Sequence, residues 1–95
     1  MSIDNRGRVE AIRNALETAL APSKLEIRDD SRRHAGHAGA KDGRGHFTVE
    51  IISEAFSGMN ALARHRAIYS ALGELMTTDI HALAIEAHAP DEDHR

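Results

Sequence analysis

Apolar residues recur every three or four positions near the beginning of the chain. Polar residues fill the opposite side of the same stretch, which is typical of a helix that packs one face on a core. Pro22 ends this helix, because proline has no backbone N–H and disfavours helical geometry at the residue before it. The apolar face of the predicted helix consists of Val9, Ile12, Leu16, Ala19 and Leu20.

Three later stretches, at 24–30, 46–52 and 80–88, alternate between apolar and polar residues. Such alternation predicts half-buried strands, since successive side chains of a strand point to opposite faces. The residues that share a side are Leu25 and Ile27 in the first stretch, Phe47, Val49 and Ile51 in the second, and His81, Leu83, Ile85 and Ala87 in the third.

Helical spacing returns between the second and third predicted strands. A turn at 56–60 leads to Asn60, a residue type that favours the N-cap position, and the predicted helix runs from there to about Met76. Its stripe is Leu62, His65, Ile68, Tyr69, Leu72, Leu75 and Met76.

The order of these elements predicts an α+β fold. A crossover helix joins the second and third strands, so we expect them to be parallel, and we expect the first two strands to be antiparallel. Because the outward positions of the strands are polar, helices should cover one face only. The prediction is therefore a two-layer domain over residues 1–90 with a three-stranded mixed sheet, followed by a disordered acidic tail at 91–95.

Between the first two strands lies a long stretch, 31–46, with several glycines and no large apolar side chain. It cannot contribute to a core, and a loop of this length in a small domain is usually functional or mobile. The stretch carries two histidines, His34 and His37, and two neighbouring arginines, Arg32 and Arg33.

The composition of the 95 residues limits the classes of function. There is no cysteine, so the chain by itself supplies neither disulfides nor thiolate ligands, whereas its seven histidines can bind metal as neutral imidazoles. No apolar run suits a signal peptide or a membrane span, so we expect a cytoplasmic location. Because no phosphate-binding loop, dinucleotide fingerprint or framed nucleophile is present, we do not expect an enzyme.

Several motifs, taken together and in order, resemble the BolA-like family over roughly residues 8 to 90. The resemblance implies a class II KH-like fold with the order α-β-β-α-α-β. It also implies a monothiol glutaredoxin partner, with which family members share a 2Fe–2S cluster in iron–sulfur trafficking or iron regulation. The motifs are Leu25-Glu26-Ile27-Arg28, His34-Ala35-Gly36-His37, His46-Phe47, Phe56-Ser57-Gly58, Arg64-His65-Arg66 and Ile80-His81-Ala82-Leu83.

The family pattern also implies ligands. One ligand would be His81, and the second would come from the loop, where His34 is the first candidate and His37 the competing one. The glutaredoxin and its bound glutathione would supply two sulfurs, so no cofactor is expected on this chain alone. From their positions, His46 and His65 are expected to be structural.

Nucleic-acid binding is the alternative prediction. Some bacterial members of the family are described as DNA-binding regulators of morphology and stress genes, and Arg64 and Arg66 lie on a helix that could enter a major groove. Arg32 and Arg33 could add to such a basic patch. Against this prediction stand a net charge of -3 and the scarcity of aromatic residues. Whether the free protein is a monomer or a weak homodimer is left open.

Overall fold

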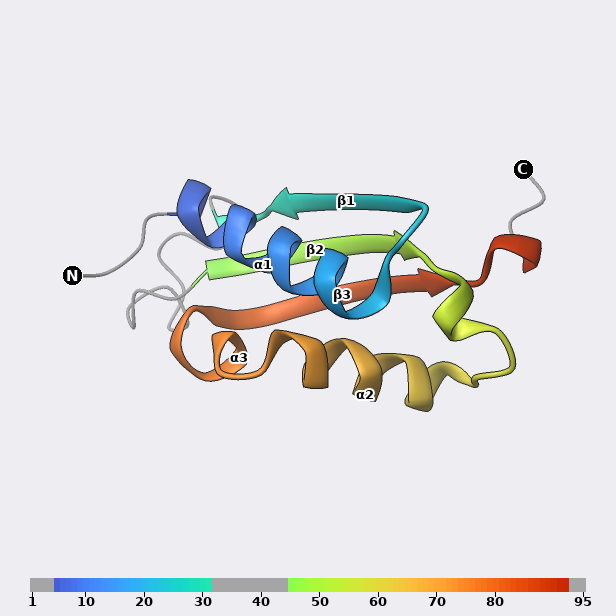
Figure 1. Cartoon of the computed structure of the whole chain (residues 1–95). Coiled ribbons are helices and arrows are strands. Elements are labelled where there is room, and N and C mark those ends of the chain that lie inside the picture. Colours follow the sequence, from blue (N-terminus) through green and yellow to red (C-terminus); the bar gives the residue numbers. More distant parts are fainter. Residues whose placement is uncertain (1–4, 32–44, 93–95) are drawn as a thin grey trace.

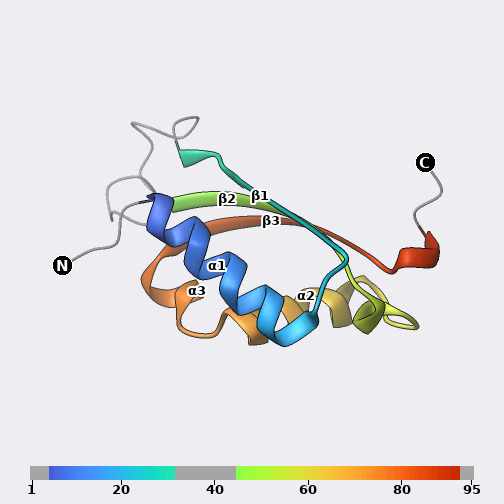
Figure 2. The same ribbon diagram turned by 45° about the horizontal axis from the view of Figure 1, so that its top comes forward.

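A three-stranded sheet carries helices on one face, as the ribbon in Figures 1 and 2 shows. The computed structural model describes residues 5–31 and 45–92, and the statements below concern these residues. The helices are α1 (Asn5–Leu20), α2 (Ala61–Leu72) and α3 (Leu75–Thr78), the strands are β1 (Lys24–Asp29), β2 (Gly45–Ile52) and β3 (Ile80–His88), and two 3-10 turns are η3 (Glu54–Phe56) and η4 (Pro90–Glu92).

The sheet has the order β1-β2-β3 and confirms the predicted strand directions. β1 pairs with β2 in antiparallel fashion, from Lys24 opposite Ile52 to Asp29 opposite Phe47. β2 and β3 are parallel, with a register shift between Gly45 and His46. As a result, the end of β1 and the beginnings of β2 and β3 meet at one end of the sheet.

Apolar side chains from the sheet and from both long helices form the core. β2 contributes Phe47, Val49 and Ile51, all buried, and this agrees with the predicted inward side. The predicted stripe of α1 is confirmed at its centre, where Ile12 and Leu16 are fully buried, whereas Ala19 is exposed. The core is completed by Phe56, Ile68, Leu72, Ile80 and Ala89.

The single helix predicted for 60–76 is wrong in extent and in its buried face. It ends at Leu72, because Gly73 adopts a positive φ of 55°, and α3 begins after that break. Two members of the predicted stripe are exposed, Leu62 at 58% and Tyr69 at 42%. The ridge of α2 that is buried carries Arg64, Ile68 and Leu72 instead.

The helix boundaries follow local chemistry. The Asn60 side chain accepts a hydrogen bond from the backbone N–H of Ala63 at 2.9 Å, which confirms the predicted N-cap of α2. At the end of α1, Ala21 has a φ of 44° before Pro22, and the Ser53 hydroxyl donates to the carbonyl of Leu20 at 2.6 Å. This last bond fixes the end of α1 to the end of β2.

The C-terminal segment is ordered further than the sequence predicts. Disorder was expected from residue 91, but Pro90–Glu92 form the 3-10 turn η4, and Glu92 lies within hydrogen-bonding distance of Arg64 on α2. Residues 93–95 lie outside the described part of the chain. Among the described residues, no helix combines the length and the apolar character needed to cross a membrane.

Candidate functional site

Two histidines meet at the end of the sheet where β2 and β3 begin. The ring centroids of His46 and His81 are 5.1 Å apart, and their planes are tilted by 49°. His81 is exposed and His46 is buried. The parallel pairing of β2 and β3 explains this contact, because it brings two residues that are distant in sequence to adjacent positions at the same sheet end.

The backbone of His46 is held by the last residues before the long loop. Its N–H donates to the Ser31 hydroxyl at 3.0 Å, and its carbonyl accepts from the N–H of Asp30 at 2.7 Å. The N–H of Ser31 donates to the Asp29 carboxylate at 2.9 Å, a local turn that aspartate side chains favour. The residue after β1 and the start of β2 are therefore tied together, which fixes both ends of segment 32–44.

Gly45, next to His46, needs to be glycine for steric reasons. A Cβ atom at this position would lie 2.6 Å from the Phe47 ring, well inside the ordinary contact distance. The Gly45 N–H donates to the carbonyl of Asp79 at 2.9 Å. This bond joins the beginning of β2 to the residue that precedes β3. It therefore helps to fix the position of His46 relative to His81 along the two strands.

A buried ion pair supports the beginning of β3. The Arg8 Nε atom of α1 lies 3.0 Å from the Asp79 carboxylate, and the two side chains are only 8% and 12% exposed. The pKa of Asp79 is lowered by the hydrogen bond from the Thr78 hydroxyl and also by Arg8, while burial acts in the opposite direction. Because Asp79 lies two residues before His81, the pair holds the backbone that presents this imidazole.

The predicted ligands are only partly within the described structure. His81 lies at the sheet end described above, whereas His34 and His37 lie in 32–44, outside the described residues, as do Arg32 and Arg33. In the described ranges, no group of three or more His, Cys, Asp or Glu side chains could hold a metal ion. The contact between His46 and His81 is not predicted by the sequence analysis, which expects His46 to be structural. The only signal for it in the sequence is that His46 lies at the start of a strand predicted to be parallel to the strand of His81.

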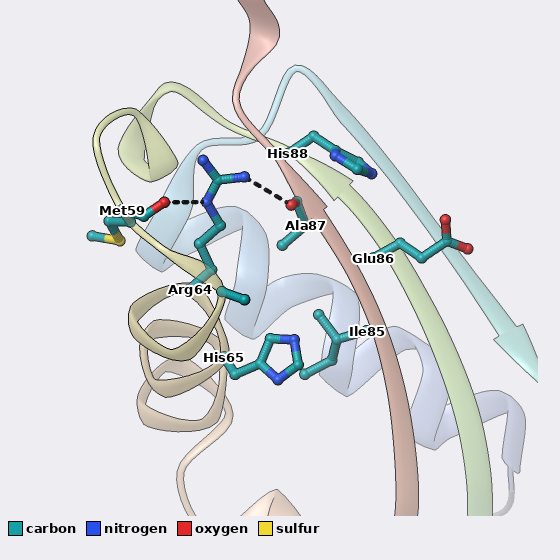
Figure 3. A pocket seen from close by; sticks show the side chains of 8 residues that line it. Met59, Arg64, His65, Ile85, Glu86, Ala87 and His88 are labelled. Carbon is teal, nitrogen blue, oxygen red and sulfur yellow. Dashed lines mark hydrogen bonds between the residues drawn. The ribbon is translucent and has the colours of Figure 1, made fainter. Parts of the chain in front are cut away.

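A groove of about 470 Å³ lies at the other end of β3, between this strand and the beginning of α2 (Figure 3). Met59 and Ile85 give it apolar walls, and the His65 ring points toward Ile85. Glu86 and His88 project from β3 in the direction away from α2. The groove is also lined by Ala61, Arg64 and Ala87.

Arg64 does not lie on an exposed helix face, so its prediction as a residue that could enter a major groove of DNA is wrong. Its Nε donates to the carbonyl of Met59 at 2.9 Å, and Nη1 donates to the carbonyl of Ala87 at 3.1 Å. Nη1 and Nη2 also donate to the two carboxylate oxygens of Glu92, at 2.7 and 2.6 Å. Arg66, on the same helix, is exposed.

The contact between Arg64 and Glu92 changes the acid–base behaviour of both groups. The hydrogen bonds from Arg64 and from the backbone N–H of Ala89 lower the pKa of Glu92 to about 2. In turn, the hydrogen bond to Glu92 raises the pKa of Arg64. The two groups are therefore charged at every physiological pH, and η4 is joined to α2 by a charge-assisted pair.

The sheet, the helices on one of its faces and the histidine at the start of β3 define a BolA-like domain. The chain matches the BolA-like protein family over residues 16–92, and it belongs to this family. The structure also resembles that of the BolA domain of SufE1 from Arabidopsis thaliana, with a TM-score of 0.80, 39% identity, and coverage of 97% of this chain and 100% of that one.

Relatives of this chain in plants and bacteria carry names that describe different kinds of protein. The chain is 44% identical over 94 residues to the chloroplastic protein BOLA1 of Arabidopsis thaliana, covering 96% of this chain and 58% of that protein. It is 41% identical over 83 residues to the DNA-binding transcriptional regulator BolA of Escherichia coli (strain K12), covering 87% and 76%. The chain thus spans less than two thirds of the plant relative.

Proposed function

We propose that this chain is a non-catalytic adaptor that binds a monothiol glutaredoxin and contributes imidazole ligands to a shared 2Fe–2S cluster. The observation that carries the proposal is the exposed His81 beside the buried His46, at the sheet end where segment 32–44 is attached. An exposed imidazole on a rigid strand can bind a metal that another protein holds in part. The proposed role is in iron–sulfur trafficking or iron regulation.

The donor set of the chain fits a shared site better than a site of its own. A 2Fe–2S cluster takes four ligands, and histidines replace two cysteines in some such centres. This sequence has no cysteine, so a partner and its glutathione would supply the sulfurs. His81 would be one nitrogen ligand, and His34, or in its place His37, would be the second.

The proposed function is tested with the purified chain, a monothiol glutaredoxin, iron, sulfide and glutathione, followed by visible absorption and circular dichroism. We expect a spectrum that differs from that of the glutaredoxin alone and that is lost in His81→Ala. His65→Ala is the matched control, because His65 lies on α2 at the groove, away from the paired histidines, and should leave the spectrum unchanged. An unaltered glutaredoxin spectrum in the mixture would contradict the proposal.

Nucleic-acid binding is a second candidate, and two observations favour it. A relative that is 41% identical carries the name of a DNA-binding regulator, and the groove between α2 and β3 contains an arginine. KH domains, which the order of elements resembles, bind single strands rather than duplexes. We therefore propose that any nucleic acid lies in this groove, and that a role in stress-related transcription would depend on it.

The strand preference of this second candidate is open to a direct test. We expect a single-stranded oligonucleotide to bind more tightly than the duplex of the same sequence, because the buried Arg64 cannot enter a major groove. A salt titration of both forms measures the number of phosphate contacts. Tighter binding to the duplex, with a preference for promoter over scrambled sequence, would contradict the placement in the groove.

Partner state and location stay predictions. We propose that the free form is a monomer or weak homodimer and that the glutaredoxin complex is a heterodimer. The cytoplasmic location that the composition favours is not the one named for the relatives in Arabidopsis thaliana, which are described as chloroplastic or as chloroplastic/mitochondrial.

A further inference from the structure

The donors of Arg64 divide into two sets. One set, Nε and one N–H of Nη1, binds the carbonyls of Met59 and Ala87 and so attaches the guanidinium to both walls of the groove. The other set faces Glu92, whose two carboxylate oxygens accept at 2.7 and 2.6 Å. This two-point geometry is the one in which arginine binds carboxylate or phosphate ligands. Glu92 thus occupies a preformed oxyanion site.

Glu92 is held less firmly than the arginine that it contacts. Its side chain is 42% exposed, compared with 11% for Arg64. It lies on a single 3-10 turn, which is closed by bonds to Ala89 at 3.0 and 3.2 Å. Because the carboxylate is partly exposed and lies on a single turn, another oxyanion can replace it while the guanidinium remains bound to Met59 and Ala87.

The surroundings of the oxyanion site suit an extended polymer. Ala87 turns its carbonyl toward α2, whereas that of His88 accepts a hydrogen bond from Ser53 at the end of β2. Because backbone groups alternate along a strand, Leu83 and Ile85 present theirs to the same side as Ala87. Glu86 lines the groove as well, but its side chain projects away from α2 (Figure 3).

We propose that Glu92 is an intramolecular latch on this site, and that the site binds a phosphate of single-stranded nucleic acid when Glu92 is released. The proposal rests on the second candidate function and adds its regulation. Phosphate diesters offer two oxygens to the two N–H groups that Glu92 now occupies, and the backbone of β3 can bind the bases beside them. In the free chain the latch occupies the N–H groups of Arg64 that would bind the phosphate.

The test compares the affinity of three proteins for a fluorescent single-stranded DNA of mixed sequence, by anisotropy at several salt concentrations. Glu92→Gln removes the charge of the latch, and Asp91→Asn removes the same charge from the neighbouring residue, for which no hydrogen bond to Arg64 is found. We expect about fivefold tighter binding for Glu92→Gln, because this variant no longer offers a carboxylate that competes with phosphate for Arg64. Its salt slope should be steeper by about 0.7, which corresponds to one phosphate. Asp91→Asn should stay within about twofold of the unaltered chain.

Other outcomes would contradict the proposed role of Glu92, and they can be told apart. Equal binding by the unaltered chain and Glu92→Gln would leave nucleic-acid binding intact but remove the latch. An equal gain in both variants would mean that net charge alone matters. If Glu92→Gln binds no DNA, the groove is not a phosphate site, and the second candidate function fails as well. The same conclusion holds if this variant binds poly-glutamate of the same length as tightly as the DNA.

The position of the bound phosphate needs a second measurement, because replacing Arg64 would also remove its bonds to Met59 and Ala87. The Nε–H signal of Arg64 in the NMR spectrum of Glu92→Gln reports on the guanidinium directly. We expect this signal to shift when the single-stranded DNA is added. Binding that leaves the signal unmoved would place the DNA elsewhere and overturn the proposal.

Discussion

At the scale of single residues, the chain uses buried charges to hold the exposed imidazole of His81 in place. Asp79 accepts from Arg8 and Thr78, and its own carbonyl accepts from Gly45. These contacts join α1, the end of α3 and the start of β2 at the point where β3 begins. Because a rigid site needs supporting contacts as well as ligands, this cluster is as much part of the site as His81 itself.

Loss of the ion pair between Arg8 and Asp79 should lower the free energy of unfolding substantially. Asp79→Asn leaves a buried guanidinium without its counter-charge, and removing one partner of such a pair costs about 3 kcal/mol of unfolding free energy. Urea unfolding followed by far-ultraviolet circular dichroism measures this loss. The matched control is Glu10→Gln, which breaks the exposed contact with Arg13 and should cost under about 0.5 kcal/mol. Equal losses in the two variants would contradict the role given to Asp79.

At the scale of elements, the 3-10 turn η4 depends on the charge of Glu92. Hydrogen bonds from Arg64 and Ala89 lower the pKa of Glu92 from 4.5 to about 2 in the folded chain. A carboxyl whose pKa is lower in the folded state stabilises the fold above its unfolded pKa, and the contribution disappears as the pH falls through the folded pKa. The contribution of Glu92 is therefore complete above about pH 5 and is lost between there and pH 2.

Melting temperatures measured along this pH range check the contribution of η4. We expect Glu92→Gln to melt below the unaltered chain at pH 6, and the difference between the two to shrink as the pH approaches 2. Asp91→Asn again serves as the control for net charge, because it removes one carboxylate without touching the bonds to Arg64. A difference that is the same at pH 6 and pH 2.5 would contradict the account.

The elements also show what a sequence can and cannot reveal. Alternation predicts the three strands correctly, since the burial of Phe47, Val49 and Ile51 in β2 follows directly from period two. Periodicity predicts the wrong buried face for α2. The reason is that Arg64, whose guanidinium is hydrogen-bonded on Nε, Nη1 and Nη2, occupies a buried position at which an apolar residue is normally expected. The break at Gly73 was missed for a related reason: apolar residues continue past it in helical spacing.

At the scale of the whole molecule, the two sites lie at opposite ends of β3. The paired histidines are at its beginning, and the groove with Arg64 and Glu92 is at its end (Figures 1 and 3). Neither pairing follows from sequence spacing, because His46 and His81 meet through the register of parallel strands, and Arg64 meets Glu92 through the path of the C-terminal turn. The resemblance to the BolA-like family implies a ligand role for His81, but it does not point to His46 or Glu92 as partners.

The separation of the two sites allows both candidate functions in one molecule. A glutaredoxin at the histidine end would leave the groove accessible, and a nucleic acid in the groove would leave His81 exposed. Of the two, the shared cluster is the central claim, because it accounts for an exposed histidine that is supported by a buried ion pair and a buried second histidine.

The most direct test of this claim is pulsed electron paramagnetic resonance of the reduced cluster in the mixed glutaredoxin complex. Imidazole ligands give nitrogen hyperfine couplings that sulfur ligands do not. We expect couplings from two histidine nitrogens, of which one disappears in His81→Ala while the other is lost in a variant of His34 or His37. A spectrum without histidine nitrogen couplings, or one that His81→Ala leaves unchanged, would contradict the account.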